Sequence, residues 1–164
     1  MVGGRSLGIA LAGFALVLAG IVPMLRLQAG RSNSEHRDAR RVIQAGPATG
    51  GLPYSPGILV GNTLYLAGTI GEDDANNIVP GGIEAETRRA LANVGEVLKA
   101  AGMGFQDVTS VTVYITSFDD FAKFNEVYHQ VFSTDPPARA TVQVAALVGG
   151  AKVELQMIAV KPDR

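Results

Sequence analysis

The sequence contains no cysteine and no tryptophan, and only two histidines among its 164 residues. Without cysteine there is no disulfide framework, no thiolate nucleophile and no thiolate ligand for a metal. The two histidines, His36 and His129, are too few to suggest a histidine-based metal site. We therefore expect no metal, and we interpret His129 as a surface or interface residue.

Charge of either sign is also scarce. Fourteen Lys and Arg stand against fifteen Asp and Glu, a net charge of -1, and charged residues make up 18% of the chain, against about 25% in an average soluble protein. Proteins that bind a nucleic-acid backbone normally have more Lys and Arg than Asp and Glu. This balance argues against nucleic acid as a partner and against a ribonuclease. The chain also lacks a glycine loop with a phosphate-binding lysine and a strand-turn-helix GxGxxG motif, so we expect no cofactor.

The hydrophobic share, 47%, is high, and its surplus lies at the N-terminus. Residues 6–25 carry no charge, and as a helix they would be about 30 Å long, enough to cross a bilayer core. We interpret residues 1–30 as a signal anchor, with a cleaved signal peptide as the alternative. The protein is then membrane-anchored or exported. If Met24 is the true start, it is cytoplasmic.

Residues 31–40 are polar and aperiodic and predict a tether, so residues 41–164 form the single folded domain. Hydrophobic patterns and turn residues predict strands at 41–44, 58–60, 63–67, 108–116, 139–146 and 152–160. The clearest helix is 83–101, with Gly102 at its C-terminal cap. A second helix carries Phe121, Phe124 and Tyr128, is capped by Ser117 or Asp119 and is stopped before Pro136-Pro137.

This order of elements predicts an α+β fold in which both helices cover one face of a single mixed sheet. The other face then needs a cover. Because several strands are apolar on both sides, we expect subunits to pack sheet to sheet in an oligomer.

The candidate functional side chains lie on the last two predicted strands. Arg139 follows Pro136-Pro137-Ala138, so the chain that enters it is stiff and extended, and guanidinium groups bind carboxylates bidentately. Glu154 alternates with Val153, Leu155 and Met157, so its side chain projects from the sheet face opposite to that of these apolar residues. A carboxylate between hydrophobic neighbours can act as a general base toward water. On spacing alone, a solvated surface role for both side chains stays open.

Longer motifs give these two residues a context. The runs PPARATVQVAAL (136–147) and VELQMIAV (153–160), with Pro53-Tyr54-Ser55 and Asn125-Glu126-Val127-Tyr128, resemble the RidA/YjgF family of enamine/imine deaminases. The resemblance covers about residues 41–161. It implies a chorismate-mutase-like fold, a homotrimer and active sites in the clefts between subunits.

The resemblance also implies a role for each matching residue. Arg139 matches the arginine that binds the substrate carboxylate, and Glu154 matches the acid associated with the attacking water. Tyr54 and Asn125 match side chains that line the cleft, and Gly68 matches a glycine near main-chain contacts to the substrate. Departures from the usual pattern occur at four positions: Thr141 stands where a cysteine is frequent, and the others are Ala67, Thr69 and Gln156.

The function implied is hydrolysis of reactive 2-imino acids, such as 2-iminopropanoate, 2-iminobutanoate and the enamine 2-aminoacrylate, to 2-oxo acids and ammonia. Neither metal nor cofactor is required. Two alternatives remain open. One is a non-catalytic regulatory module that holds a keto acid or similar carboxylate in the Arg139 cleft. The other is a membrane-tethered interaction or chaperone-like protein of the same fold.

Overall fold

The structure is a computed structural model that describes residues 39–47 and 49–162. The predicted signal anchor, 1–30, and most of the predicted tether lie outside these residues. Within the described part of the chain, no helix combines the length and the apolar character that a membrane span requires.

One sheet of seven strands forms the centre of the domain. Its strands are β1 (Arg41–Ile43), β2 (Gly57–Val60), β3 (Thr63–Leu66), β4 (Thr69–Ile70), β5 (Val108–Ile115), β6 (Ala138–Gln143) and β7 (Val153–Val160). The spatial order is β1-β2-β3-β7-β5-β6, and the short β4 also pairs with β7. All pairs are antiparallel except β5 with β6. The last strand of the sequence therefore lies in the middle of the sheet.

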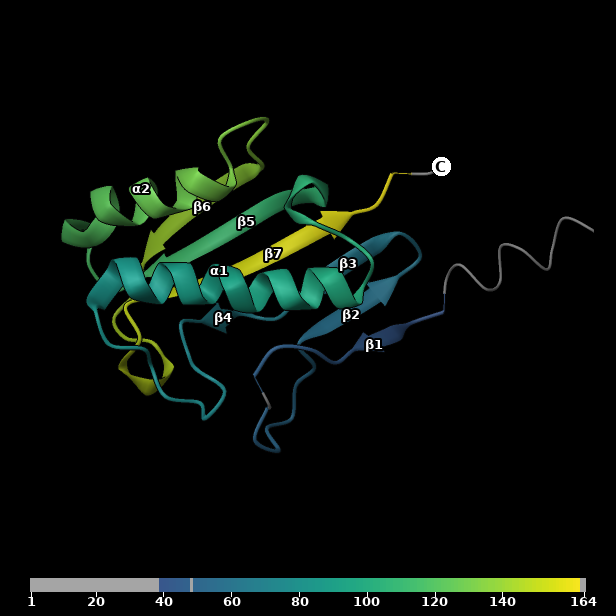
Figure 1. Cartoon of the computed structure of the whole chain (residues 1–164), viewed down its shortest axis with the longest axis horizontal. Coiled ribbons are helices and arrows are strands. Elements are labelled where there is room, and N and C mark those ends of the chain that lie inside the picture. Colours follow the sequence, from purple (N-terminus) through teal and green to yellow (C-terminus); the bar gives the residue numbers. More distant parts are fainter. Residues whose placement is uncertain (1–38, 48, 163–164) are drawn as a thin grey trace, which may run out of the picture.

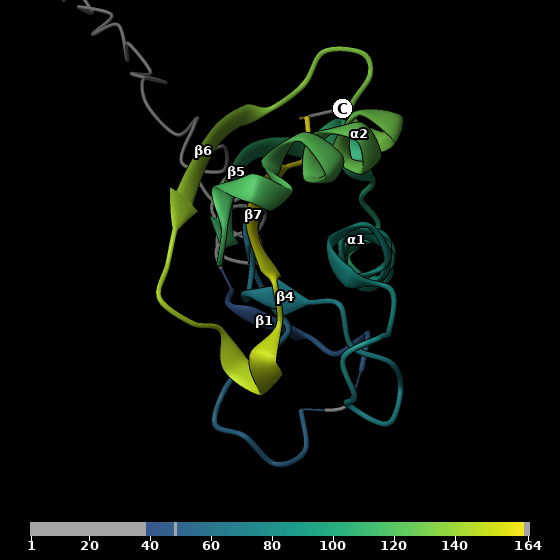
Figure 2. The same ribbon diagram turned by 90° about the vertical axis from the view of Figure 1, so that its left-hand side faces the viewer.

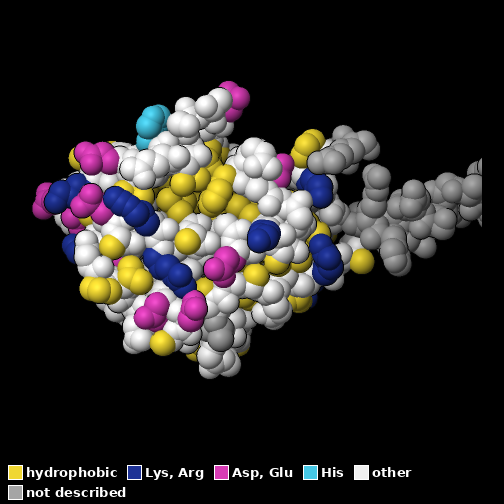
Figure 3. Space-filling view, viewed as in Figure 1, with side chains coloured by type: hydrophobic (Ala, Val, Ile, Leu, Met, Phe, Trp, Pro, Cys, Tyr) yellow, Lys and Arg dark blue, Asp and Glu magenta, His cyan; other side chains and the backbone are white. Residues whose placement is uncertain are grey.

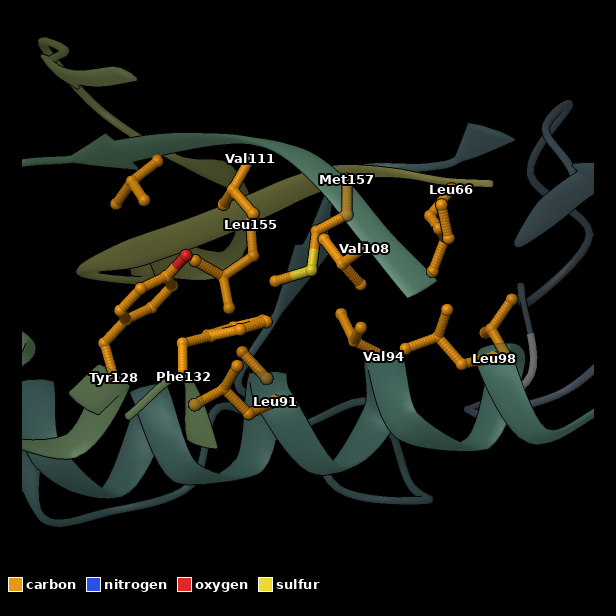
Figure 4. Close-up of a cluster of buried hydrophobic side chains, with 14 of the residues drawn as sticks. Leu66, Leu91, Val94, Leu98, Val108, Val111, Tyr128, Phe132, Leu155 and Met157 are labelled. Atoms are coloured by element: carbon orange, nitrogen blue, oxygen red, sulfur yellow. The ribbon is translucent and has the colours of Figure 1, made fainter. Parts of the chain in front are cut away.

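Two helices, α1 (Gly82–Ala100) and α2 (Phe121–Val131), cover one face of this sheet. Figure 1 shows both helices in front of the strands, and Figure 2, turned by 90°, shows them on the same side. The core fills the space between helices and sheet, and Figure 4 shows side chains of both layers meeting there. Its largest fully buried members include Phe124, Leu64, Leu98, Ile115, Leu155 and Met157.

The spacing of hydrophobic residues and the glycine at the C-terminal cap explain helix α1. The predicted face is buried, with Leu91 and Val94 at 3% and 0% exposure. At the end, the Met103 N–H donates to the Leu98 carbonyl and the Gly102 N–H donates to the Lys99 carbonyl. This Schellman pattern needs a left-handed residue, and Gly102 has φ 72. The predicted glycine cap is confirmed.

The other predicted elements are confirmed with three corrections. Ser117 caps a 3-10 turn, Phe118–Asp120, where its hydroxyl accepts from the Asp119 N–H, whereas α2 begins after Asp120 and has no side-chain cap among the described residues. The two-residue strand β4 is too short to leave a periodic signal in the sequence. Strand β6 ends at Gln143 instead of Ala146. Its partner β5 ends at Ile115, and the Val144 N–H donates to the Ile115 carbonyl as the final bond of this pair, so the residues beyond have no neighbouring strand to bond.

The second sheet face is open, as predicted. The register aligns Val42, Ile58, Tyr65 and Ile158 across β1, β2, β3 and β7 on this face. Tyr65 is 50% exposed, and Val142 on β6 is 45% exposed. In the strands that the structure describes, Glu154 is the one charged side chain on this face. A sheet face that exposes several apolar side chains and a single charge is typical of a surface that another protein covers.

The helix face has a different character. Figure 3 shows Lys, Arg, Asp and Glu side chains interspersed on it, around hydrophobic side chains that gather between α1 and α2. Leu91, Phe105, Val127 and Val131 line the groove there. Neither sign of charge forms a continuous patch on the face shown.

Candidate functional site

Glu154 lies in the middle of the open sheet face. It stands opposite Tyr114 of β5, while its neighbours Val153 and Leu155 are buried under the helices. Desolvation by burial raises the pKa of Glu154 above its ordinary value, because removal of water disfavours the charged form. Within the described residues, its carboxylate has no salt-bridge partner. The result is a carboxylate that is more basic than a solvated glutamate.

Gly68 leaves the space that the Glu154 carboxylate occupies. It lies in the short connection between β3 and β4, beside β7. A Cβ atom on Gly68 would overlap the Oε1 atom of Glu154. The absence of a side chain at this position therefore sets the place of the carboxylate.

Tyr54 belongs to the same region. It lines a small hollow together with Gly68, Thr69, Glu72 and other residues, and it is 45% exposed. Desolvation, and then the nearby charge of Glu72, raise the pKa of Tyr54 above its ordinary value. Tyr54 therefore keeps its proton at neutral pH and can donate a hydrogen bond from the rim of this hollow.

Arg139 lies at the opposite side of the sheet, on the edge strand β6. Its partner across the parallel pair is Val111, which faces the helices, so the arginine side chain extends toward α2. There it lines a second hollow, of which Asn125, Tyr128, His129 and Pro137 are also part. In the described part of the chain, no carboxylate lies within salt-bridge distance of its guanidinium. The guanidinium is exposed and free to bind an anion.

The predicted residues thus form two separate groups in one chain. Tyr54, Gly68 and Glu154 form the first, and Asn125 and Arg139 form the second. Strand β5 separates Arg139 from Glu154, and their partners on it, Val111 and Tyr114, are three residues apart. With strands about 4.8 Å apart and about 3.3 Å of rise per residue, the two Cα atoms are about 14 Å apart. Their side chains leave opposite faces, so they cannot hold one small substrate within a single chain.

The other positions named from the sequence are distributed between the two groups. Thr141 lies on β6 opposite Val113, on the same face as Arg139. The Thr69 hydroxyl donates to the Ala67 carbonyl. The Tyr114 hydroxyl donates to Gln156 Oε1 on the open face. Thr69 and Gln156 are therefore engaged with the protein itself.

Sequence reasoning missed the contacts that surround Arg139. Its guanidinium carbon lies 4.7 Å from the ring centroid of Tyr128, 5.7 Å from that of Phe124 and 5.9 Å from that of Phe121. The helical spacing of these aromatic residues assigns them to the core. Only the packing of α2 against β6 shows that they also contact the arginine.

Comparisons with known proteins find relatives in sequence and in fold. The family model described as Endoribonuclease L-PSP matches residues 43–161. A 2-iminobutanoate/2-iminopropanoate deaminase from Capra hircus is 45% identical over 124 residues, 74% of this chain and 90% of the relative. Among solved structures, a protein described as a putative endoribonuclease from Thermotoga maritima aligns with a TM-score of 0.72 at 39% identity, covering 75% and 98% of the two chains. E. coli TdcF, solved with bound serine, aligns with a TM-score of 0.68 at 34% identity, covering 74% and 99%.

Proposed function

Since the chain belongs to the RidA/YjgF family and is a hydrolase of the 2-iminobutanoate/2-iminopropanoate deaminase type, we propose that it converts small 2-imino acids to 2-oxo acids and ammonia. The enamine tautomers of these acids, such as 2-aminoacrylate, enter the same reaction. The observation that carries the proposal is the pair of complementary groups. Arg139 is an exposed cation with no carboxylate partner in the described residues, and Glu154 is a carboxylate with a raised pKa.

A complete site requires a second copy of the chain. The open sheet face of one subunit carries Glu154, and the α2–β6 side of another carries Arg139 and Asn125. When the face is covered, both groups can line one cleft. This fits the homotrimer with sites between subunits that the family resemblance implies. Burial against a second copy would also raise the pKa of Glu154 further, because more water is removed.

Substrate binding begins at the carboxylate of the imino acid. Arg139 offers N–H donors in a planar fork, which matches a carboxylate bidentately. Asn125 and Tyr54 add hydrogen-bonding side chains at the two sides of the cleft. The hollow that Gly68 and Tyr54 line is small, which favours short substrate side chains. E. coli TdcF with its bound serine is a relative that holds a small amino acid.

The chemical step needs one water and one carboxylate. Ionised Glu154 accepts a proton from the water while the oxygen forms a bond to C2 of the imine, and the C=N electron pair moves to nitrogen. Glu154 then returns its proton to the nitrogen. Glu154 next accepts the hydroxyl proton of this carbinolamine and passes it to the nitrogen, so the C–N bond breaks, ammonia departs and the C2 oxygen becomes the carbonyl of the 2-oxo acid. Holding water and substrate in line supplies most of the acceleration.

The test is a turnover assay with the full-length protein. An amino-acid oxidase generates the imine, and the release of 2-oxo acid and ammonia is followed for wild type, Arg139→Ala and Glu154→Gln. We expect acceleration by wild type and its loss in both variants. No acceleration by wild type, together with tight 2-oxo acid binding that depends on Arg139, would identify a non-catalytic carboxylate-binding module. Absence of both activities would leave the interaction or chaperone-like function.

The cellular location is a separate proposal, because it depends on residues 1–30. Twenty uncharged residues, 6–25, precede the domain, and we propose that they anchor it to a membrane or direct its export. Membrane fractionation with protease accessibility of the C-terminal domain tests this. Recovery of the full-length protein in the soluble fraction with its N-terminus intact would support the cytoplasmic alternative.

A further inference from the structure

The surroundings of Arg139 raise a specific question. A mobile arginine is a poor carboxylate receptor, because its side chain must be ordered when the substrate binds, at a cost of about 0.5 to 1.5 kcal/mol. An acidic partner can hold such an arginine in place through a bidentate pair. In the described residues Arg139 has none, and its strand has a neighbour on one side only. Something else must fix the guanidinium.

Three aromatic rings of α2 lie where they can fix the position of the Arg139 guanidinium. We propose that Tyr128 is a positioning residue for Arg139 and that Phe121 and Phe124 complete an aromatic seat for the guanidinium, which leaves its N–H donors free for the substrate carboxylate. This proposal deepens the proposed function and rests on it. The seat consists of Phe121, Phe124 and Tyr128, whose ring centroids lie 5.9, 5.7 and 4.7 Å from the guanidinium carbon.

The chemistry of a ring suits this task better than that of a carboxylate. The face of an aromatic ring attracts a cation within about 6 Å, whereas a carboxylate would occupy the same planar fork of donors that the substrate needs. Burial raises the pKa of Tyr128 to about 12, so its ring stays neutral over the working range. The seat therefore holds the arginine without competing with the substrate.

The seat itself is rigid. Phe124 and Tyr128 are 0% and 6% exposed, and the Tyr128 ring packs against the rings of Phe124 and Phe132 with centroid distances of 5.5 and 4.6 Å. The Tyr128 hydroxyl points toward the sheet, beside the labelled Leu155 (Figure 4), and has no hydrogen-bond partner among residues 39–47 and 49–162. The ring and not the hydroxyl is thus the part that contacts the arginine.

This division between ring and hydroxyl gives a sharp test. Tyr128→Phe keeps the ring, and Tyr128→Leu removes it. Phe105→Leu is the matched control, because Phe105 packs edge-on against Phe132 in the same core but has no contact with the arginine. For each full-length variant we would measure KM, kcat and Tm, and the Kd for 2-oxobutanoate by calorimetry.

We expect Tyr128→Leu to raise KM and Kd about three- to tenfold, the equivalent of losing a preordered arginine, with a much smaller change in kcat. Tyr128→Phe should match wild type in both constants. Phe105→Leu should lower Tm as Tyr128→Leu does and leave KM and Kd unchanged. If Tyr128→Leu does not fold, Phe121→Leu, at a partly buried position, replaces it with the same expected direction.

Two results would overturn the proposal: unchanged KM and Kd in Tyr128→Leu, or equal increases in Tyr128→Phe and Tyr128→Leu. The Kd measurement needs no turnover. An inactive wild type whose 2-oxobutanoate binding still depends on the Tyr128 ring would therefore refute the deaminase and keep the aromatic seat.

Discussion

At the scale of single residues, the environment of Glu154 governs how the protein responds to pH. Its carboxylate is partly desolvated and unpaired within the described residues, so ionisation is unfavourable there and the pKa is raised. A general base must be ionised in order to accept a proton. As the pH is lowered, activity should therefore be lost at a higher pH than it would be with an ordinary glutamate as the base.

The prediction for Glu154 concerns both rate and stability. The acidic limb of the wild-type pH profile of kcat/KM should have its midpoint above 4.5, the reference value for glutamate. Since the folded pKa is raised, ionised Glu154 costs stability above that pKa and nothing below the unfolded value. Glu154→Gln should thus raise Tm at pH 7 but not at pH 4. An equal Tm difference at both pH values would contradict this assignment.

Gly68 gives a second prediction at this scale. In Gly68→Ala the new methyl group would occupy the position of the Glu154 carboxylate, and the carboxylate would have to move. A displacement of about 1 Å can cost a hundredfold in rate, so we expect kcat/KM to fall about a hundredfold with little change in Tm.

Gly95→Ala is the matched control for Gly68→Ala. Gly95 lies in α1, and a Cβ there would meet Phe105 at 3.4 Å, an ordinary contact. The variant should keep full activity and gain about 0.5 to 1 kcal/mol from its higher helix propensity. Equal losses of activity in the two variants would show that the carboxylate position is not the cause.

At the scale of elements, Asn93 joins α1 to the end of β4 and to the chain that follows it. It is 1% exposed, and its Nδ2 donates to the carbonyls of Ile70 and Glu72 at 3.3 and 3.0 Å. The Glu72 carbonyl also accepts from Arg89 Nε. These bonds hold the segment that lines the Tyr54 hollow.

Asn93→Leu should lower the free energy of unfolding by about 1 to 2 kcal/mol. It removes both N–H donors from the part-buried carbonyls of Ile70 and Glu72, but Arg89 still satisfies the second of them. The substitution also removes the buried Asn93 Oδ1, which has no partner among the described residues. Urea denaturation monitored by circular dichroism measures the change. Gln130→Leu, on the exposed side of α2, should stay within about 0.5 kcal/mol. A loss of the same size in both would contradict the role of Asn93.

The sequence predicts these elements well where one face is buried. Helix α1 and strand β5 have a clear period because Leu91, Val94, Val111 and Val113 face one core. The face of Glu154 is predictable for the same reason. The face of Arg139 is not, because β6 is an edge strand whose residues are mostly exposed on both sides, so alternation carries no signal there. The central place of β7 depends on long-range pairing that no local pattern encodes.

At the scale of the whole molecule, the separation of Arg139 from Glu154 makes the site a property of the assembly. Co-expression of Arg139→Ala with Glu154→Gln tests this. Each variant alone should be inactive. In mixed oligomers, a cleft with both native groups forms when an Arg139 from one variant meets a Glu154 from the other, which random assembly gives in about one quarter of clefts.

We therefore expect co-expression to restore about a quarter of wild-type activity, measured on the purified mixture. Mixing the separately purified variants without subunit exchange should restore none and serves as the control. If the co-expressed mixture stays inactive although mass spectrometry shows mixed oligomers, each site must be built from one chain, and the two-copy site is wrong.

The position of β7 has a consequence for how the protein is made. This strand follows all the other strands of the domain in the sequence, yet it joins β1–β3 on one side to β5 and β6 on the other. A nascent chain that stops before Val153 has two sheet fragments and no strand between them. Neither fragment can close the core, so the domain folds only after β7 has been synthesised. A stop codon before Val153 would therefore leave an unfolded chain instead of a shortened enzyme.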